Sequence, residues 1–328
     1  MTAISSLKRH PLLVTLLTLG LVCVVGFAMN HRMAIVRLLA PTLPIPALGY
    51  QTNEGSEAYW YDDYFIVSRI DDDTYAIGEP RYHQGNFNYL ILGTSRAILF
   101  DSGPGLRDIA PVVRSLTSLP VTTAVSHLHY DHVGHFGKFE AAAMLDIPPL
   151  RWRDKGDVLE VFDSEHLGFI EHFANRALVV TEWWAADEPI DLGGRRIIVR
   201  HTPGHTGDSM ILEDPERSQF FTGDTFYPGE LYAFLPGSSL GAYAETVERL
   251  LMQVDDTSTL YGAHRLVESG VPTLTRQDLL DFSQTLERIH NETASYEGFF
   301  PRSYKVNDNL SILTDVPWGQ DWSKSYEP

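Results

Sequence analysis

Cysteine is almost absent from this chain of 328 residues: Cys23 is the only one, and it lies in an apolar stretch near the N-terminus. No disulfide can form within the chain, which neither requires nor excludes an oxidising compartment. Basic residues are also scarce, with 25 Lys and Arg against 43 Asp and Glu, for a formal net charge of −18. Phosphate backbones are bound by cationic surfaces, so this charge argues against a nucleic-acid partner.

Internal repeats and low-complexity tracts are not apparent either, and 44% of the residues are hydrophobic. A chain of this length can bury a sizeable core in one large domain or two small ones. The apolar periodicity alternates between extended and helical segments, which is typical of an α/β layered protein. We expect strands near residues 65–68, 75–77, 89–92, 97–100 and 121–125, and helices over residues 109–119, 241–253 and 275–291.

The N-terminus differs from the rest of the chain. Residues 12–29 carry no charge and follow Lys8, Arg9 and His10. Eighteen residues are at the lower limit of what spans a bilayer, and small residues around Ala28 also suit cleavage of a secretory signal. We expect residues 1–30 to be a membrane anchor, with the lipid bilayer as a partner. A cleaved signal and a buried helix of a soluble domain are the alternatives.

Orientation in a membrane is weakly defined, because basic residues on the two sides of the apolar stretch nearly balance. A short N-terminal tail with two cations favours a main domain outside the cytoplasm, whereas cleavage near Ala28 would give a secreted or periplasmic protein. The proline-rich residues 41–46 predict a stiff, extended tether within residues 31–58. The main domain would then comprise residues 59–328.

Chemistry is concentrated in the run Ser126-His127-Leu128-His129-Tyr130-Asp131-His132. Neutral imidazoles and carboxylates suit zinc and, less exclusively, iron and manganese. His127 and His129 alternate, so an extended segment projects them to the same side, while Asp131 and His132 need a turn to reach a second position. One short loop can thereby serve two adjacent metals, which is the geometry that activates a bridging water. The alternative is a histidine-rich surface loop with incidental metal affinity.

Three later segments each end a strand-like stretch with a ligand-type residue. These residues are His205, Asp224 and His264. Gly204 and Gly223 directly precede the first two and allow the backbone to approach an ion closely. Because every one of these side chains follows a strand, one edge of a β framework could gather them into a single cleft.

This pattern resembles the metallo-β-lactamase-fold hydrolase superfamily, which includes glyoxalase II and N-acyl-homoserine lactonases. The resemblance covers roughly residues 65–265 and rests on the His-x-His-x-Asp-His motif with a later His, Asp and His. It implies a four-layer αββα sandwich with helices outside two central sheets, a catalytic domain over residues 59–328, and two Zn²⁺ per chain, with Fe or Mn as alternatives. The implied ligands are His127, His129 and His205 for the first metal, Asp131, His132 and His264 for the second, and Asp224 as a bridge together with a hydroxide.

The resemblance also implies roles beside the metals. Asp101, in Asp101-Ser102-Gly103-Pro104-Gly105, matches the family's earlier acidic motif, whose carboxylate orients the ligand loop. Homoserine lactonases carry a tyrosine at the offset of Tyr227 that donates to the substrate carbonyl; the alternative is a tyrosine that packs the cleft wall. Asp131 is expected in addition to protonate the leaving alkoxide. His201 lacks a preceding glycine and is interpreted as non-ligating, and His135 is expected to begin a helix and line the cleft.

The reaction implied is hydrolysis of a lactone or a related ester in a small molecule. A thioesterase of the glyoxalase II type is the second candidate. It ranks below the lactonase because the helix expected over residues 275–291 shows no clear basic site for glutathione. A mononuclear iron sulfur dioxygenase is disfavoured by the retention of His132 and His264, and a non-catalytic tethered binding protein is the remaining class. The sequence does not define the oligomeric state. Bulky apolar residues after the bridging carboxylate favour a substrate with apolar bulk: Tyr227, Leu231, Tyr232, Phe234 and Leu235.

Overall fold

The computed structural model describes residues 31–40, 44–56, 58–265 and 269–323. The chain divides into two compact units, Met1–Pro44 and Ile45–Pro328. In the first unit the described residues 31–39 are helical, while the predicted anchor or signal, residues 1–30, lies outside the described residues. Among the residues that the structure describes, no helix is both long enough and apolar enough to cross a membrane.

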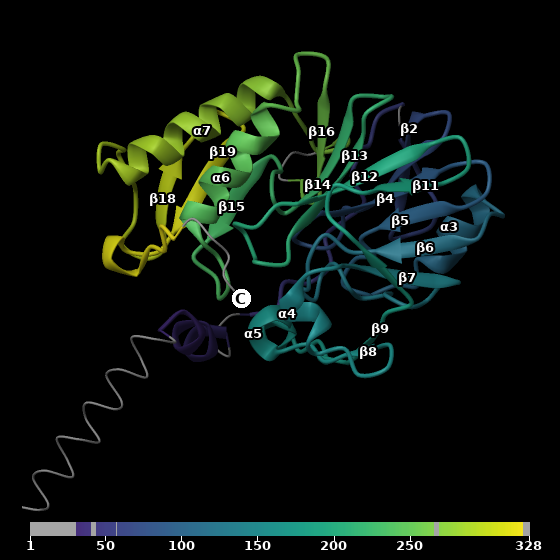
Figure 1. Cartoon of the computed structure of the whole chain (residues 1–328), viewed down its shortest axis with the longest axis horizontal. Coiled ribbons are helices and arrows are strands. Elements are labelled where there is room, and N and C mark those ends of the chain that lie inside the picture. The colour runs from purple at the N-terminus through teal and green to yellow at the C-terminus, as the bar shows by residue number, and fades with distance from the viewer. Residues whose placement is uncertain (1–30, 41–43, 57, 266–268, 324–328) are drawn as a thin grey trace, which may run out of the picture. The chain divides into compact units, whose positions relative to one another are not determined.

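The second unit is built on two mixed β-sheets (Figure 1). In the part of the chain that is described, the first sheet has the order β1-β2-β3-β4-β5-β6-β7-β10. Pairing is antiparallel from β1 to β5 and parallel from β5 to β10. The strands are β1 (Ala58–Trp60), β2 (Ile66–Asp71), β3 (Thr74–Glu79), β4 (Asn86–Leu92), β5 (Ala97–Phe100), β6 (Val121–Ala124), β7 (Ala141–Leu145) and β10 (Glu182–Trp184).

The second sheet has the order β11-β12-β13-β14-β16-β17, with one parallel pair, β14 and β16. Its strands are β11 (Pro189–Asp191), β12 (Arg196–His201), β13 (Met210–Asp214), β14 (Gln219–Gly223), β16 (Thr259–Gly262) and β17 (Thr273–Leu274). Two smaller sheets complete the β structure of the described residues. They comprise β15 (Gly229–Ala233), β19 (Leu310–Thr314) and β18 (Arg302–Lys305) in one case, and β8 (Val158–Leu159) and β9 (Leu178–Val179) in the other.

Alternation along the strands explains how the layers pack, because successive side chains point to opposite faces of a sheet. Ile98 of the first sheet and Leu212 of the second lie in one buried cluster, so these faces of the two sheets pack on each other. Leu99, on the opposite face of the first sheet, packs instead with Val112 and Val113. Ile211, on the opposite face of the second sheet, packs in a third cluster with residues of two long helices.

The two long helices are α6 (Leu240–Leu251) and α7 (Arg276–His290), and Val112 and Val113 belong to the shorter α3 (Ala110–Leu116). Ser239 caps α6 by accepting from Ala242 N at 3.2 Å, and Thr275 and Asp278 form a capping box at the start of α7. The three helices predicted from periodicity are therefore confirmed, with ends that differ by a few residues. Helices thus cover the outer faces of both sheets, and the predicted α/β class is confirmed.

A 36-residue excursion, residues 146–181, separates β7 from its parallel neighbour β10. It contains only short elements and lies at the lower edge of the second unit in Figure 1. These are α4 (Pro148–Arg151), β8, α5 (Asp163–His166), the 3₁₀ turn η2 (Gly168–Ile170) and β9. A further 3₁₀ turn, η3 (Pro317–Gly319), follows β19.

The structure of residues 31–58 differs from the extended tether that the sequence predicts. Residues 31–39 are helical, and the segment from Ile45 onward belongs to the second unit. Glu54 is buried and accepts from the Arg265 guanidinium at 2.7 and 3.0 Å. A proline-rich sequence predicts local stiffness, but it carries no information on whether a later carboxylate finds a distant cation.

Candidate metal centre

The histidine-rich run forms an irregular loop immediately after β6, and Asp101 holds it in place. Asp101 follows β5, the strand beside β6, and its carboxylate accepts from Ser126 N at 2.6 Å. Its second oxygen, Oδ2, lies 3.0 Å from His132 Nδ1. One carboxylate therefore fixes both ends of the loop, which is the geometry expected for the residue that orients it.

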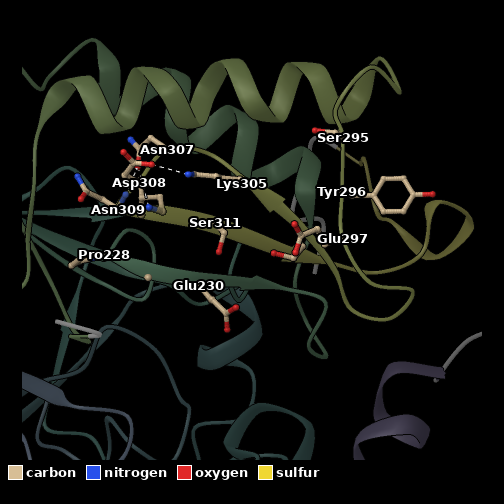
Figure 2. A pocket seen from close by; sticks show the side chains of 13 residues that line it. Pro228, Glu230, Ser295, Tyr296, Glu297, Lys305, Asn307, Asp308, Asn309 and Ser311 are labelled. Carbon is tan, nitrogen blue, oxygen red and sulfur yellow. Dashed lines mark hydrogen bonds and ion pairs between the residues drawn. The ribbon is translucent and has the colours of Figure 1, made fainter. Parts of the chain in front are cut away.

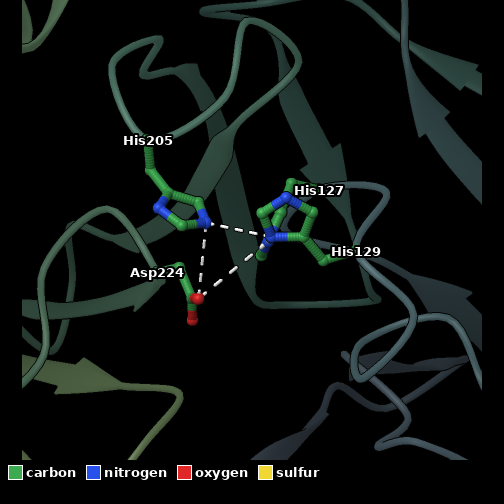
Figure 3. Close-up of side chains that lie close together, drawn as sticks. All are labelled: His127, His129, His205 and Asp224. Carbon is green, nitrogen blue, oxygen red and sulfur yellow. Dashed lines mark hydrogen bonds and ion pairs between the residues drawn. The ribbon is translucent and has the colours of Figure 1, made fainter. Parts of the chain in front are cut away.

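Figure 3 shows the first group of converging side chains, formed by His127, His129, His205 and Asp224. All four are buried, and one ligand-type atom from each lies within 4.8 Å of the others. His129 Nδ1 lies 2.7 Å from His127 Nε2 and 3.1 Å from His205 Nε2. Asp224 Oδ2 lies 3.5 Å from His205 Nε2.

The second group consists of Asp131, His132 and His264, also buried and also within 4.8 Å of one another. Asp224 Oδ1 lies 2.9 Å from His264 Nε2 and 3.4 Å from His132 Nε2. Because Oδ2 of the same carboxylate faces the first group, Asp224 lies between the two groups with one oxygen toward each. The structure thus brings together all seven residues that the sequence nominated as ligands.

Backbone and side-chain acceptors fix the outer nitrogens of four imidazoles. His205 Nδ1 donates to Tyr232 O at 2.8 Å, and His264 Nδ1 donates to Gln84 O at 3.1 Å. Since a carbonyl only accepts, these two rings carry their proton on Nδ1, and in the neutral form they present a bare Nε2 lone pair inward. The outer nitrogens of His127 and His132 lie 3.0 Å from Ser126 Oγ and 3.0 Å from Asp101 Oδ2.

Burial keeps the three histidines of the first group neutral. It lowers the pKa of His127 well below the usual value, and the charges of neighbouring histidines add to this effect. Burial, together with the charge of His205, lowers the pKa of His129 to about 3, and burial also lowers the pKa of His205. At neutral pH these three rings are therefore available as uncharged ligands.

Carboxylates dominate the second group. Burial alone would lower the pKa of His132, but Asp131 and Asp101 outweigh it and raise that pKa well above the usual value. The pKa of His264 is likewise raised by Asp224 against the effect of burial. The same negative charge would favour a divalent cation in place of these protons, so metal binding here should release protons.

The donor set fits a pair of divalent ions of the zinc type. Five imidazoles and two carboxylates converge in a water-poor site, and no cysteine is among them. Among the described residues, the buried His132 Nε2 and Asp224 Oδ1 make no hydrogen bond, although Asp224 Oδ1 lies 2.9 Å from His264 Nε2 as an ion pair. Unpaired buried polar atoms are rare in folded proteins and call for a missing partner, which ions between the two groups would supply.

Tyr227 does not offer its hydroxyl as predicted. That hydroxyl donates to Glu230 O, while the ring packs edge-on against His264 with centroids 5.1 Å apart. Its single proton is therefore committed to the backbone, and the side chain supports the His264 ring, which corresponds to the packing alternative. Sequence offset locates a residue beside the site but does not define the direction of its hydroxyl.

Two histidines that the sequence analysis set apart from the ligands are His201 and His135. His201 Nε2 lies 2.8 Å from Gly207 O, outside both groups, as predicted. His135 lies in a turn and does not begin a helix, so that expectation is wrong. Its Nδ1 lies 3.2 Å from Ser102 O, and hydrogen bonds to the Asp101–Gly105 segment take the place of helical ones.

Asn86 is a site residue that the sequence reading missed. Its Nδ2 donates to Asp131 O at 2.9 Å and to Asp131 Oδ2 at 3.2 Å, and its backbone pairs with His264. Asn86 therefore holds one ligand of the second group and lies beside another. A signal was present, because Asn86 and Asn88 interrupt a buried apolar strand, and buried amides are kept only where they are hydrogen-bonded.

Asp208 gives a pH-dependent test of the same region. It is buried, its Oδ2 has no partner, and burial together with the charge of Glu165 raises its pKa from 3.8 to about 6. A raised pKa means that the folded wild type loses stability as the pH rises through this range. We expect Asp208→Asn, measured against wild type by urea unfolding, to gain about 1 kcal/mol in free energy of unfolding between pH 5 and pH 8. A difference that does not change with pH would contradict this.

A cavity of about 650 Å³ lies elsewhere, on one face of the small sheet β15-β19-β18 (Figure 2). Glu230, Ser311 and Lys305 line it from neighbouring strands, and Lys305 is paired with Asp308 at 2.7 Å. None of the seven converging side chains lines this cavity. The cavity is therefore separate from the buried centre.

Comparison with known proteins agrees with this geometry. The family model described as Metallo-beta-lactamase superfamily matches residues 84–264, a range that contains all seven converging side chains. The Homo sapiens protein named acyl-coenzyme A thioesterase MBLAC2 is 28% identical over 216 residues, covering 59% of this chain and 77% of the human protein.

Two solved structures share the fold. A metallo-beta-lactamase from Pontibacter korlensis is 16% identical with a TM-score of 0.50, covering 68% of this chain and 99% of its own. A metallo-beta-lactamase from Erythrobacter litoralis is 15% identical with a TM-score of 0.50, covering 73% of this chain and 100% of its own. At these identities the likeness concerns the fold alone.

Proposed function

This chain belongs to the metallo-beta-lactamase superfamily and is a metal-dependent hydrolase, and from that premise we propose that it cleaves acyl ester-type bonds, an acyl thioester first, at a two-metal centre. The observation that carries the proposal is Asp224, whose two oxygens face two separate groups of ligand-type residues. We assign His127, His129 and His205 to one ion, Asp131, His132 and His264 to the other, and Asp224 to both.

The protein's own residues prepare the reaction. His205 and His264 are locked by backbone carbonyls, so their Nε2 lone pairs stay aimed inward without reorganisation. Bound divalent ions would supply Lewis acidity and lower the pKa of coordinated water from 15.7 toward about 7. The carboxylates among the seven ligand-type residues attract cations. Because none of the seven is a cysteine, zinc, iron or manganese is favoured over softer metals.

Asp131 is proposed to carry a proton to the leaving group. Burial would raise its pKa, but the charges of His132 and His264 outweigh this and lower the pKa, so the side chain begins ionised. Its Oδ2 lies 3.4 Å from His132 Nε2 and 3.5 Å from His264 Nε2 and would be the oxygen that holds the ion, so the proton released by the attacking water would be taken up at Oδ1 and passed from there to the leaving group. Asn86, which donates to the same Oδ2, holds the carboxylate in place for this exchange.

An aromatic wall supports an apolar acyl group. Tyr232, whose carbonyl holds His205, has its ring 5.6 Å from that of Phe234, which in turn lies 5.6 Å from Phe300. All three are partly exposed, whereas Leu231 of the same segment is buried in the core. We assign this wall, rather than the whole apolar segment, to the substrate's hydrocarbon part.

Thioester chemistry is placed first because a relative at 28% identity is named an acyl-coenzyme A thioesterase. Lactones and related oxygen esters are the second candidate, because a net charge of −18 disfavours a polyanionic leaving group and favours a neutral substrate.

Turnover of a matched panel by the zinc-loaded full chain tests the proposal. The panel is an acyl-coenzyme A, a lactone with the same acyl chain, and a phosphodiester. We expect acyl cleavage at least about 100-fold above phosphodiester cleavage in kcat/KM, which corresponds to about 3 kcal/mol of transition-state discrimination. Phosphodiester cleavage equal to acyl cleavage, or no acyl cleavage at all, would refute the proposal.

A further inference from the structure

The excursion of residues 146–181 contacts the loop that carries four of the seven ligand-type residues. Tyr130 N, in that loop, donates to His166 O at 2.8 Å. The Tyr130 ring stacks on Phe173 with centroids 5.1 Å apart. The main chain and the side chain of Tyr130 are therefore both held by a segment that contributes no ligand itself.

Glu171 is the polar centre of this contact. Its Oε1 accepts from Tyr130 Oη at 2.8 Å and lies 3.1 Å from His83 Nε2, while its Oε2 accepts from Tyr82 Oη at 2.8 Å. The side chain is only 9% exposed. Burial would raise the pKa of Glu171, but the donors from His83, Tyr130 and Tyr82 outweigh it, so the group is held as a carboxylate.

Gln84 completes the network. Its Nε2 donates to Tyr130 Oη at 2.7 Å and to Tyr82 Oη at 3.0 Å, so each tyrosine hydroxyl donates to Glu171 and accepts from Gln84. The backbone carbonyl of the same residue accepts from His264 Nδ1. A part-buried network of connected hydrogen bonds of this kind rigidifies the groups that it joins.

The position of Tyr130 gives the network its consequence. Tyr130 is the single residue between His129, which belongs to the first group, and Asp131, which belongs to the second. Fixing Tyr130 fixes the placement of these two ligands relative to each other, and Gln84 extends the same control to His264. We propose that Glu171 is a positioning residue through which the 146–181 excursion sets the spacing of the two metal groups. This inference rests on the two-metal site proposed above.

The test compares the full-length wild type with Glu171→Gln and Tyr130→Phe. Glutamine replaces one acceptor oxygen by an NH₂ donor, which cannot accept from the surrounding hydroxyls. We expect both variants to bind the second zinc about 10- to 100-fold more weakly than wild type in competition with a zinc chelator. Cobalt-loaded protein should show an altered visible spectrum, and kcat should fall with little change in KM. The double variant should lose no more than the weaker-binding single variant, because both changes break one network.

Glu160→Gln is the matched control, since Glu160 lies in the same excursion but is 63% exposed and forms an ion pair with Lys155 at 3.4 Å, away from the Glu171 network. It should leave zinc affinity and the cobalt spectrum unchanged. If Glu171→Gln does not fold, Tyr130→Phe, which removes one hydroxyl, carries the same test. If wild type binds two zinc ions and the variants bind them with the same affinity, the positioning role alone is overturned. Wild type that binds no metal would overturn the proposed function as well.

Discussion

Replacing Asp224 by alanine is expected to lower kcat/KM by at least about a thousandfold, or about 4 kcal/mol. Asp224 is the one side chain that faces both groups, with Oδ1 2.9 Å from His264 Nε2 and Oδ2 3.5 Å from His205 Nε2. Removing it leaves the second group with one carboxylate and withdraws the shared ligand, so the zinc content should fall below two per chain. Steady-state kinetics and elemental analysis of the same preparation measure both effects.

The control for this substitution is Asp256→Ala, which removes a carboxylate that is 92% exposed. It should keep full activity and two zinc ions. Circular dichroism establishes whether Asp224→Ala is folded. A folded variant that retains more than about a tenth of the wild-type kcat/KM would show that Asp224 has no essential role in the reaction.

Removing the metal is expected to abolish turnover and to lower the thermal stability. An ion at a thousand times its dissociation constant stabilises the folded state by about 4 kcal/mol, which corresponds to a Tm difference of roughly 10 °C for a domain of this size. Without ions, His132 Nε2 and Asp224 Oδ1 make no hydrogen bond among the described residues, which adds to the loss. Calorimetry before and after dialysis against a chelator gives Tm, and parallel assays give activity.

Zinc added back should restore both quantities together. Activity that survives complete chelation would contradict the assignment, and so would a Tm that is the same with and without bound ions. Restoration of the hydrolytic activity by iron but not by zinc would keep the site and the reaction and change only the metal.

Side-chain chemistry made the centre readable from sequence. A metal site is indicated by the close spacing of His127, His129, Asp131 and His132, because few other roles require such residues so close together. Strand patterns also placed Asp101 and the later ligands correctly. The predicted strand at residues 97–100 coincides with β5, which Asp101 follows, and the later ligands His205, Asp224 and His264 come after β12, β14 and β16. Local pattern and residue type agree here, and prediction succeeds where they do.

The supporting interactions were less accessible. The carbonyls of Gln84 and Tyr232, which orient His264 and His205, belong to the backbone and carry no signal in residue type. The 146–181 excursion lacks regular periodicity, so its contact with Tyr130 could not be foreseen. The direction of the Tyr227 hydroxyl depends on the path of β15 at Glu230, a tertiary feature that sequence spacing does not define.

The most direct test is X-ray diffraction from zinc-loaded crystals at the zinc absorption edge. Two anomalous peaks are expected, roughly 3.5–4 Å apart as in other two-metal hydrolases, one among His127, His129 and His205 and the other among Asp131, His132 and His264. Asp224 should contribute one oxygen to each. A single peak, or peaks away from these seven side chains, would contradict a two-metal hydrolase.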